Sequence, residues 1–184
     1  MKRIYKITTI VLLSITMVIS SCKKEVDGCT DSSAMNYLSD ATSNDGSCIF
    51  AYNIAQGDWV IDTSCDSVTI NIPFIFEETI SITEIFPDSV KITGEENNVV
   101  SMDISGNKIL ADIASNGTVT VQDEQKISFD TSSFDPTGFI GEIDVNITGS
   151  GNILSASDGD LTLELTFEIL GSSQSSTCEI TFKR

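Results

Sequence analysis

The chain has 184 residues, a formal net charge of −17 and no histidine. A surface this acidic repels phosphate groups, so we expect no nucleic-acid partner. The simplest role of this negative charge is to keep the protein soluble. Binding of divalent cations is the alternative, more specific role. Because the usual general base is missing and no catalytic motif is present, we predict that the protein is not an enzyme.

Residues 1–21 have the composition of a secretory signal sequence. Three cations within the first six residues precede an apolar run over 10–19, and the small residues Ser20 and Ser21 follow. The run is shorter than the roughly 20 residues that span a bilayer, so we expect a cleaved signal rather than a membrane helix. Cys22 comes next, and this arrangement resembles the lipobox of bacterial lipoproteins. The resemblance implies that Cys22 becomes the mature N-terminus, carries lipid such as palmitate and anchors the protein to a membrane.

Residues 23–27 follow as a short charged tether that contains two lysines and two acids. The tether loosely resembles the signals that send lipoproteins of the Bacteroidetes phylum to the outer face of the outer membrane. The resemblance implies an outer-membrane lipoprotein exposed at the cell surface. A protein that faces the periplasm is the alternative.

Four cysteines remain in the expected mature chain: Cys29, Cys48, Cys65 and Cys178. An even number of cysteines in an exported protein predicts two disulfides, and three pairings are possible. Cys29 with Cys48 is the local choice, and Cys65 with Cys178 is the long one. The long bridge closes a loop of about 110 residues, which stabilises the fold by about 4–5 kcal/mol in the chain-entropy account. A metal site built from the four cysteines is less favoured because no CxxC spacing exists.

Residues 22–50 are expected to form the lipidated tether and a small disulfide-stapled module. The pattern G-C-T-D-x-x-A-x-N-Y runs from Gly28 to Tyr37, and D-G-S-C ends at Cys48. The two patterns resemble a short module of many secreted proteins of the same phylum. We favour a structural staple, since the residue order of an EF-hand loop is absent, over a calcium site. The oxygen ligands of such a calcium site would come from Asp31, Asn36, Asp40, Asn44 and Asp45.

From residue 51 to residue 184 the sequence predicts strands. Apolar and polar residues alternate without a break over 161–169, and the same period holds over 143–147 and 178–182. Period two indicates antiparallel strands with one dry and one wet face. Turn-forming residues separate these segments, so we expect about eight or nine strands and no amphipathic helix of ten residues.

Trp59 opens the first of these strands in the sequence Gly57-Asp58-Trp59, and Cys65 follows it. Together with Cys178 in the last strand, this pattern resembles lipocalin-like lipoproteins of the same phylum. The resemblance implies an all-β fold, an antiparallel up-and-down barrel of about eight strands. A β-sandwich is the alternative. In a closed meander the first and last strands are neighbours, so a bridge between Cys65 and Cys178 is easily made.

An eight-stranded barrel is just wide enough to hold one small ligand. We therefore predict a non-catalytic surface lipoprotein that binds a small apolar or amphipathic ligand and needs no cofactor. Calcium at the 29–48 module is the alternative to the structural staple. The same inward residues describe a packed core equally well, so the alternative is a cell-surface interaction or scaffold module with a solid core and a protein partner. The residues expected to contact a ligand are Trp59, Ile80, Ile82, Val145, Leu163, Leu165 and Phe167.

Overall fold

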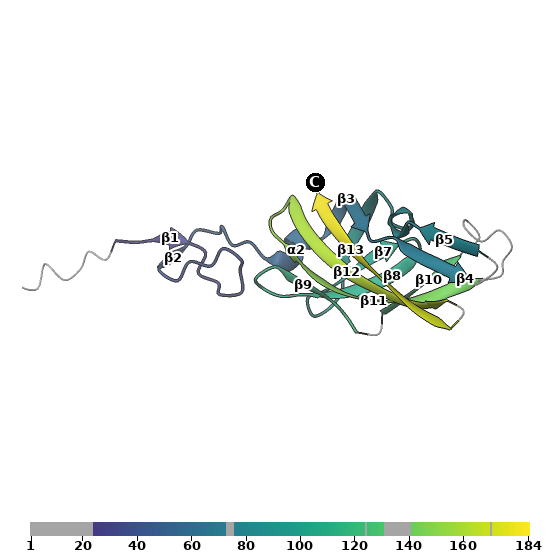
Figure 1. Cartoon of the computed structure of the whole chain (residues 1–184). Helices are drawn as coiled ribbons and strands as arrows, with labels where there is room; N and C mark the ends of the chain where they lie inside the picture. The colour runs from purple at the N-terminus through teal and green to yellow at the C-terminus, as the bar shows by residue number, and fades with distance from the viewer. Residues whose placement is uncertain (1–23, 73–75, 124, 131–140, 170) are drawn as a thin grey trace, which may run out of the picture.

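Antiparallel strands make up most of the chain in the computed structural model (Figure 1). The structure describes residues 24–72, 76–123, 125–130, 141–169 and 171–184. Its elements in chain order are β1 (Asp27–Gly28), β2 (Ser43–Asn44), α2 (Ala51–Ala55), β3 (Gly57–Cys65), β4 (Val68–Ile72), β5 (Phe76–Ile80), the 3-10 helix η1 (Ile82–Ile85), β6 (Ser89–Gly94), β7 (Val99–Ile104), β8 (Asn107–Ile113), β9 (Thr118–Val121), β10 (Gln125–Asp130), β11 (Glu142–Ile153), β12 (Asp158–Ile169) and β13 (Ser172–Lys183).

Eight of the strands close into a barrel. Neighbouring strands follow the order β11, β12, β13, β3, β6, β7, β8 and β9, and β9 pairs back with β11. Every pair in this ring is antiparallel. The predicted closed barrel is therefore confirmed and the sandwich is not formed. One extra strand, β10, pairs with β11 beside the ring.

The first and last strands of the barrel lie side by side, as the cysteine positions predicted. Cys178 of β13 stands opposite Cys65 of β3 in the register, and the two form a disulfide. The second disulfide joins Cys29 to Cys48. Both predicted pairings are confirmed. Closure through β3 and β13 leaves neither strand as an open edge, which is how barrels avoid unwanted pairing with other chains.

The alternating pattern of the sequence becomes the inside and outside of the barrel. Along β12, Leu161, Leu163, Leu165 and Phe167 are buried, while the residues between them are exposed. Burial of each such side chain contributes about 1.5–3 kcal/mol, so the alternation both forms the strands and fixes which face turns inward.

Strand β10 extends the wall of the barrel where the short strand β9 ends. Residues Gln125–Asp130 pair with the first half of β11, and β9 pairs with the second half. The gap between β10 and β8 is bridged by side chains: the Gln125 Oε1 atom accepts a bond from the Leu110 N–H at 3.2 Å, and the Asn107 Oδ1 atom accepts one from the Ser128 N–H at 3.3 Å. The wall thus continues toward the end of the barrel that carries the β4–β5 hairpin.

Two glycines allow β11 to change partner from β10 to β9. Gly149 lies between the two paired stretches, and Gly151 pairs with Val119 of β9. A Cβ atom on Gly151 would lie 2.0 Å from the carbonyl oxygen of Asp160, and one on Gly149 would lie 2.4 Å from that of Thr162. Both oxygens belong to the backbone of β12. Glycine is therefore required here because two strands approach closely, which is a common reason for glycine inside a strand.

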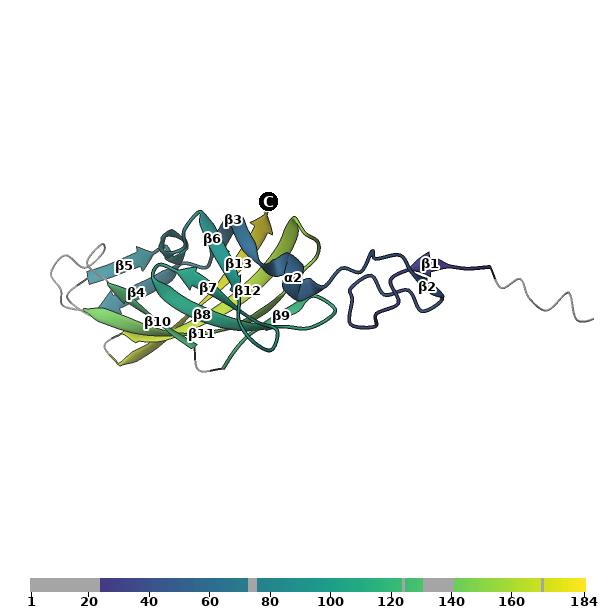
Figure 2. The ribbon, with the colours of Figure 1, turned by 180° about the vertical axis from the view of Figure 1, so that it is seen from behind.

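The small N-terminal module lies beyond the α2 end of the barrel (Figures 1 and 2). Its strands β1 and β2 pair in parallel over two residues each, and the Cys29–Cys48 disulfide joins its two halves. Met35 packs against the barrel core beside Gly117, in the turn between β8 and β9. The region predicted as barrel, 51–184, begins with α2 rather than with a strand, since five residues are too short to give a helical pattern.

We expect the substitution Gly151→Ala to lower the free energy of unfolding by about 2–3 kcal/mol, because the added methyl group overlaps backbone that is held by strand pairing. Ser150→Ala, on the exposed face of the same strand, should change it by less than about 0.5 kcal/mol. Chemical denaturation of both variants measures the difference. Equal midpoints for the two variants would show that the close approach imposes no constraint.

Candidate functional site

One end of the barrel is closed by α2 and Trp59. The Trp59 side chain is 1% exposed, and its indole N–H donates a hydrogen bond to the carbonyl oxygen of Ala55 at 2.7 Å. The ring of Phe182 meets it edge-on, with 6.0 Å between the ring centroids. Ala51 and Ala55 of α2 are buried above them. The polar atom of the indole is satisfied, so the large side chain is held in one position.

Arg184, the last residue printed, completes this closed end. Its guanidinium lies 3.9 Å from the centroid of the Trp59 ring, a cation–π contact. The same group donates to the carbonyl oxygens of Asp58 at 3.1 Å, Ile54 at 3.2 Å and Ala156 at 3.3 Å, and also to those of Ala55 and Gln56. Only arginine offers five donors in a fixed planar fork. Arg184 therefore ties β13 to α2, to the start of β3 and to the β11–β12 turn.

The interior beside this closed end is filled. The space enclosed between Ile92, Val100, Met102 and their neighbours is about 10 Å³. A void of that size holds at most one water molecule. Trp59 therefore belongs to a packed plug and does not line the cavity at the other end; its predicted contact with a ligand stays a prediction.

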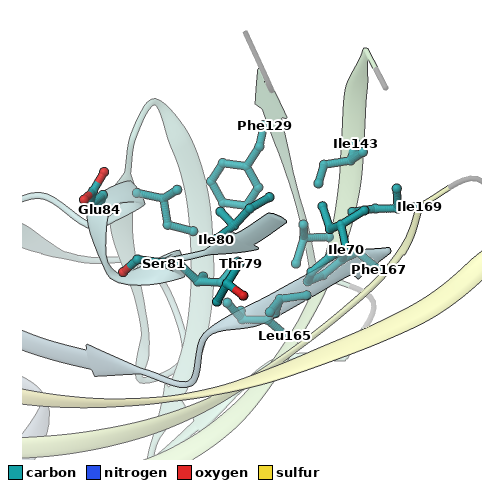
Figure 3. A pocket seen from close by; sticks show the side chains of 14 residues that line it. Ile70, Thr79, Ile80, Ser81, Glu84, Phe129, Ile143, Leu165, Phe167 and Ile169 are labelled. Carbon is teal, nitrogen blue, oxygen red and sulfur yellow. The ribbon is translucent and has the colours of Figure 1, made fainter. Parts of the chain in front are cut away.

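The opposite end of the barrel is hollow. A cavity of about 470 Å³ lies between the β4–β5 hairpin with η1 on one side and the ends of β10, β11 and β12 on the other (Figure 3). The volume falls within the range of about 300–1,000 Å³ that is usual for small-molecule sites. The cavity is lined by Val68, Ile70, Thr79, Ile80, Ser81, Ile82, Glu84, Ile85, Phe129, Ile143, Val145, Leu165, Phe167 and Ile169.

The cavity exists because the hairpin is not part of the barrel wall. Strands β4 and β5 pair only with each other among the described strands, and they stand between β3 and β6 in the sequence. Val68 and Ile70 are nevertheless buried, so this face of the hairpin turns toward the barrel interior. A two-stranded hairpin has few backbone bonds to fix its position, and its apolar face leaves space above the inner faces of β11 and β12.

Five of the seven predicted ligand-contacting residues line this cavity: Ile80, Ile82, Val145, Leu165 and Phe167. Leu163 does not line the cavity. It is fully buried in the core, two residues before Leu165 on the same face of β12. The other nine lining residues are not among those predicted: Val68, Ile70, Ile85, Ile169, the polar Thr79, Ser81 and Glu84, and finally Phe129 and Ile143. The last two follow the alternation of β10 and β11, which is the signal that identifies them.

The predicted calcium ligands of the small module are used in local hydrogen bonds. Asp31 Oδ1 accepts bonds from the N–H and the hydroxyl of Ser33, and Asn36 Oδ1 accepts one from the Ile49 N–H at 2.8 Å. Asn44 and Asp45 each accept one from the N–H two residues ahead. Bonds from Ser33 and Ser47 lower the pKa of Asp31 and of Asp45, respectively.

Within the described residues no group of three or more histidines, cysteines or acids is placed to hold a metal ion. The local bonds favour the structural staple, and Asp40 has no part in them. Calcium at the module stays a prediction.

Comparison with known proteins returned no match: no protein-family model, no curated protein and no solved structure resembles the chain closely enough to be matched. The lipoprotein and lipocalin-like resemblance therefore stays a prediction from sequence motifs. The expected signal over 1–21 and Cys22 lie outside the described residues. None of the helices that the structure describes is long and apolar enough to cross a membrane.

We expect Arg184→Ala to destabilise the protein by about 2–4 kcal/mol, since it removes five bonds to carbonyl oxygens and uncovers the Trp59 ring. Arg184→Lys should recover less than half of this loss, because lysine keeps the charge but not the planar fork. Lys126→Ala, which removes a charge from the exposed face of β10, is the matched control. Thermal unfolding, monitored by the fluorescence of Trp59, measures the stability of the four proteins. Equal stability of the forms with arginine and with lysine at position 184 would contradict the prediction.

Proposed function

We propose that the protein is an exported, lipid-anchored binding protein that holds one small apolar or amphipathic ligand in the hollow end of its barrel. The observation that supports the proposal is the contrast between the two barrel ends. One encloses about 10 Å³ and the other about 470 Å³, although both are built from the same alternating strands.

The composition of the cavity wall favours ligands with a long apolar part. Eleven of its fourteen lining residues are apolar, and Thr79, Ser81 and Glu84 are the three polar ones. Apolar walls with a few polar groups are typical of sites that take hydrophobic small molecules, in which the polar groups set orientation. An apolar ligand that enters a cavity with such walls gains both dispersion and burial energy.

Non-catalytic binding is also the better proposal on chemical grounds. Glu84 is the one titratable side chain among the lining residues, so the cavity does not offer the pair of groups with separated pKa values that many acid–base enzymes use. A scaffold module with a solid core, the alternative, has less support because it gives no role to a cavity of about 470 Å³. Location at the outer membrane rests on Cys22 and on the charged residues 23–27 that follow it, and is part of the proposal.

Filling the cavity should abolish binding. We expect Ile80→Trp to weaken the binding of the apolar fluorescent probe N-phenyl-1-naphthylamine at least tenfold, because the indole occupies the space that the probe needs. The experiment uses the polypeptide 22–184 with Cys22→Ser, which avoids lipid attachment and keeps every described residue.

The control for this experiment is Val60→Trp, which adds the same side chain on the outer face of β3, where Val60 is 61% exposed. It should bind the probe like the unmodified protein. If Ile80→Trp binds the probe as tightly as Val60→Trp, the cavity is not the binding site.

Lipid attachment is tested in producing cells. We expect the full chain to incorporate labelled palmitate and to sediment with membranes, and Cys22→Ser to lose both properties, since one thiol accepts the anchor. Cys65→Ser is unsuitable as a control because its partner would be left free; Ser21→Ala, which keeps a small residue before the cysteine, should label normally. Labelling of the Cys22→Ser form would contradict the lipobox prediction.

A further inference from the structure

The cavity at the hollow end is lined by side chains without positive charge, as far as the structure describes them. None of the described residues that line the cavity is a lysine or an arginine. The segments 73–75, 124, 131–140 and 170 contain none in their sequences either. A carboxylate or sulfate headgroup that entered with an apolar chain would therefore meet no cation to replace its hydration, and burial of an unpaired anion is costly.

None of the five cations of the barrel region lines the cavity. Arg184 lies at the closed end, Lys183 pairs with Asp158, and Lys108 pairs with Glu95 at 2.6 Å. Lys91 is exposed on the outer face of β6. Lys126 is exposed on the outer face of β10, where it stands opposite Asn146 of β11 in the register, two residues along β11 from Asp144. A cation thus stands on the outer wall near this end, but none faces the apolar interior.

Next to the cavity lies a second hollow, of about 400 Å³, whose polar walls are acidic. Glu142, Asp144 and Glu168 line it, together with Asn146 and Thr166. The two spaces share Ile143, Phe167 and Ile169 as lining residues, so they are neighbours across the ends of β11 and β12. We call this second space the acidic groove. The acids of the groove stand on the outer face of β11 and β12, and the apolar residues that the groove shares with the cavity stand on the inner face, so the two spaces meet at the strand ends.

We propose that the ligand is an amphiphile with a positively charged headgroup, such as an alkyl amine or quaternary ammonium compound. Its chain occupies the apolar cavity and its headgroup lies at the rim, between Glu84 and the acidic groove. Complementary charge selects the headgroup, and the apolar wall supplies most of the affinity. This inference rests on the proposed function, since it specifies the ligand class of the same cavity.

Three probes with the same ten-carbon chain test the proposal: decyltrimethylammonium, decanol and decanoate, each used below its micelle concentration. Their dissociation constants are measured by displacement of N-phenyl-1-naphthylamine from the 22–184 polypeptide with Cys22→Ser at 0.15 M salt. We expect the cation to bind at least tenfold more tightly than decanol, and decanoate to bind most weakly.

A charge-matched pair of triple variants separates local attraction from the general effect of the acidic surface. Glu142→Gln with Asp144→Asn and Glu168→Gln should reduce the preference for the cation over decanol at least fivefold and leave decanol binding unchanged. Asp58→Asn with Asp62→Asn and Glu179→Gln removes the same charge from exposed strand positions away from the groove, and should keep the preference. At this salt concentration the screening length is about 8 Å, so distant charges contribute little.

Two results would overturn the ligand class: decanoate or decanol binding as tightly as the cation, or an equal loss of preference in both triple variants. Thermal unfolding shows whether each variant is folded. If the triple variant of the groove does not fold, the single change Glu168→Gln replaces it and should give a smaller loss of preference in the same direction. Failure of all three probes and of N-phenyl-1-naphthylamine is a different result, because it would contradict the proposed function itself.

Discussion

The pairing of β3 with β13 is the constraint on which the rest of the structure depends. These strands come from opposite ends of the barrel sequence, so their meeting closes a loop of more than one hundred residues, and the Cys65–Cys178 disulfide holds it closed. In the chain-entropy account a bridge over such a loop contributes about 4–5 kcal/mol. The same register brings Phe182 and Arg184 beside Trp59, so closure of the sheet and closure of one barrel end are a single event.

The two ends of the barrel differ because different segments cover them. At the closed end, α2 and Arg184 bring polar donors and acceptors that satisfy one another, as the bonds from Trp59 and Arg184 to backbone carbonyls show. At the hollow end the covering segment is the β4–β5 hairpin, which brings an apolar face but no backbone pairing to the ring. Well-fixed groups pack densely, whereas an apolar face held from one side leaves volume that a ligand can occupy.

The sequence predicts the barrel well because its alternation is long and the cysteines mark the strands that meet. It does not predict the cavity, because alternation tells which side of a strand is apolar and not what that side contacts. Val68 and Ile70 have the same pattern as Val90 and Ile92, yet the first pair lines a cavity and the second lies in or beside the packed interior. For the same reason the sequence cannot separate Trp59, which lies in the packed end, from the residues that line the cavity. The role of Arg184 is not visible in the sequence, because a single cation carries no signal until Trp59 is placed next to it.

The use of charge follows from these positions. The barrel has only five cations, and three of them, Lys108, Lys183 and Arg184, are bound to carboxylate or carbonyl oxygens. Bonds from Lys183, Ser157 and Ser155 lower the pKa of Asp158, and bonds from Lys108 and Ser101 lower that of Glu95, so both acids stay charged when pH falls below their usual range. These three positively charged side chains thus connect elements at the closed end of the barrel and at the turns between strands. At the hollow end, Glu142 and Asp144 accept bonds from the neutral hydroxyl of Ser128 instead. The charge difference between the two ends is therefore a consequence of how the barrel is held together.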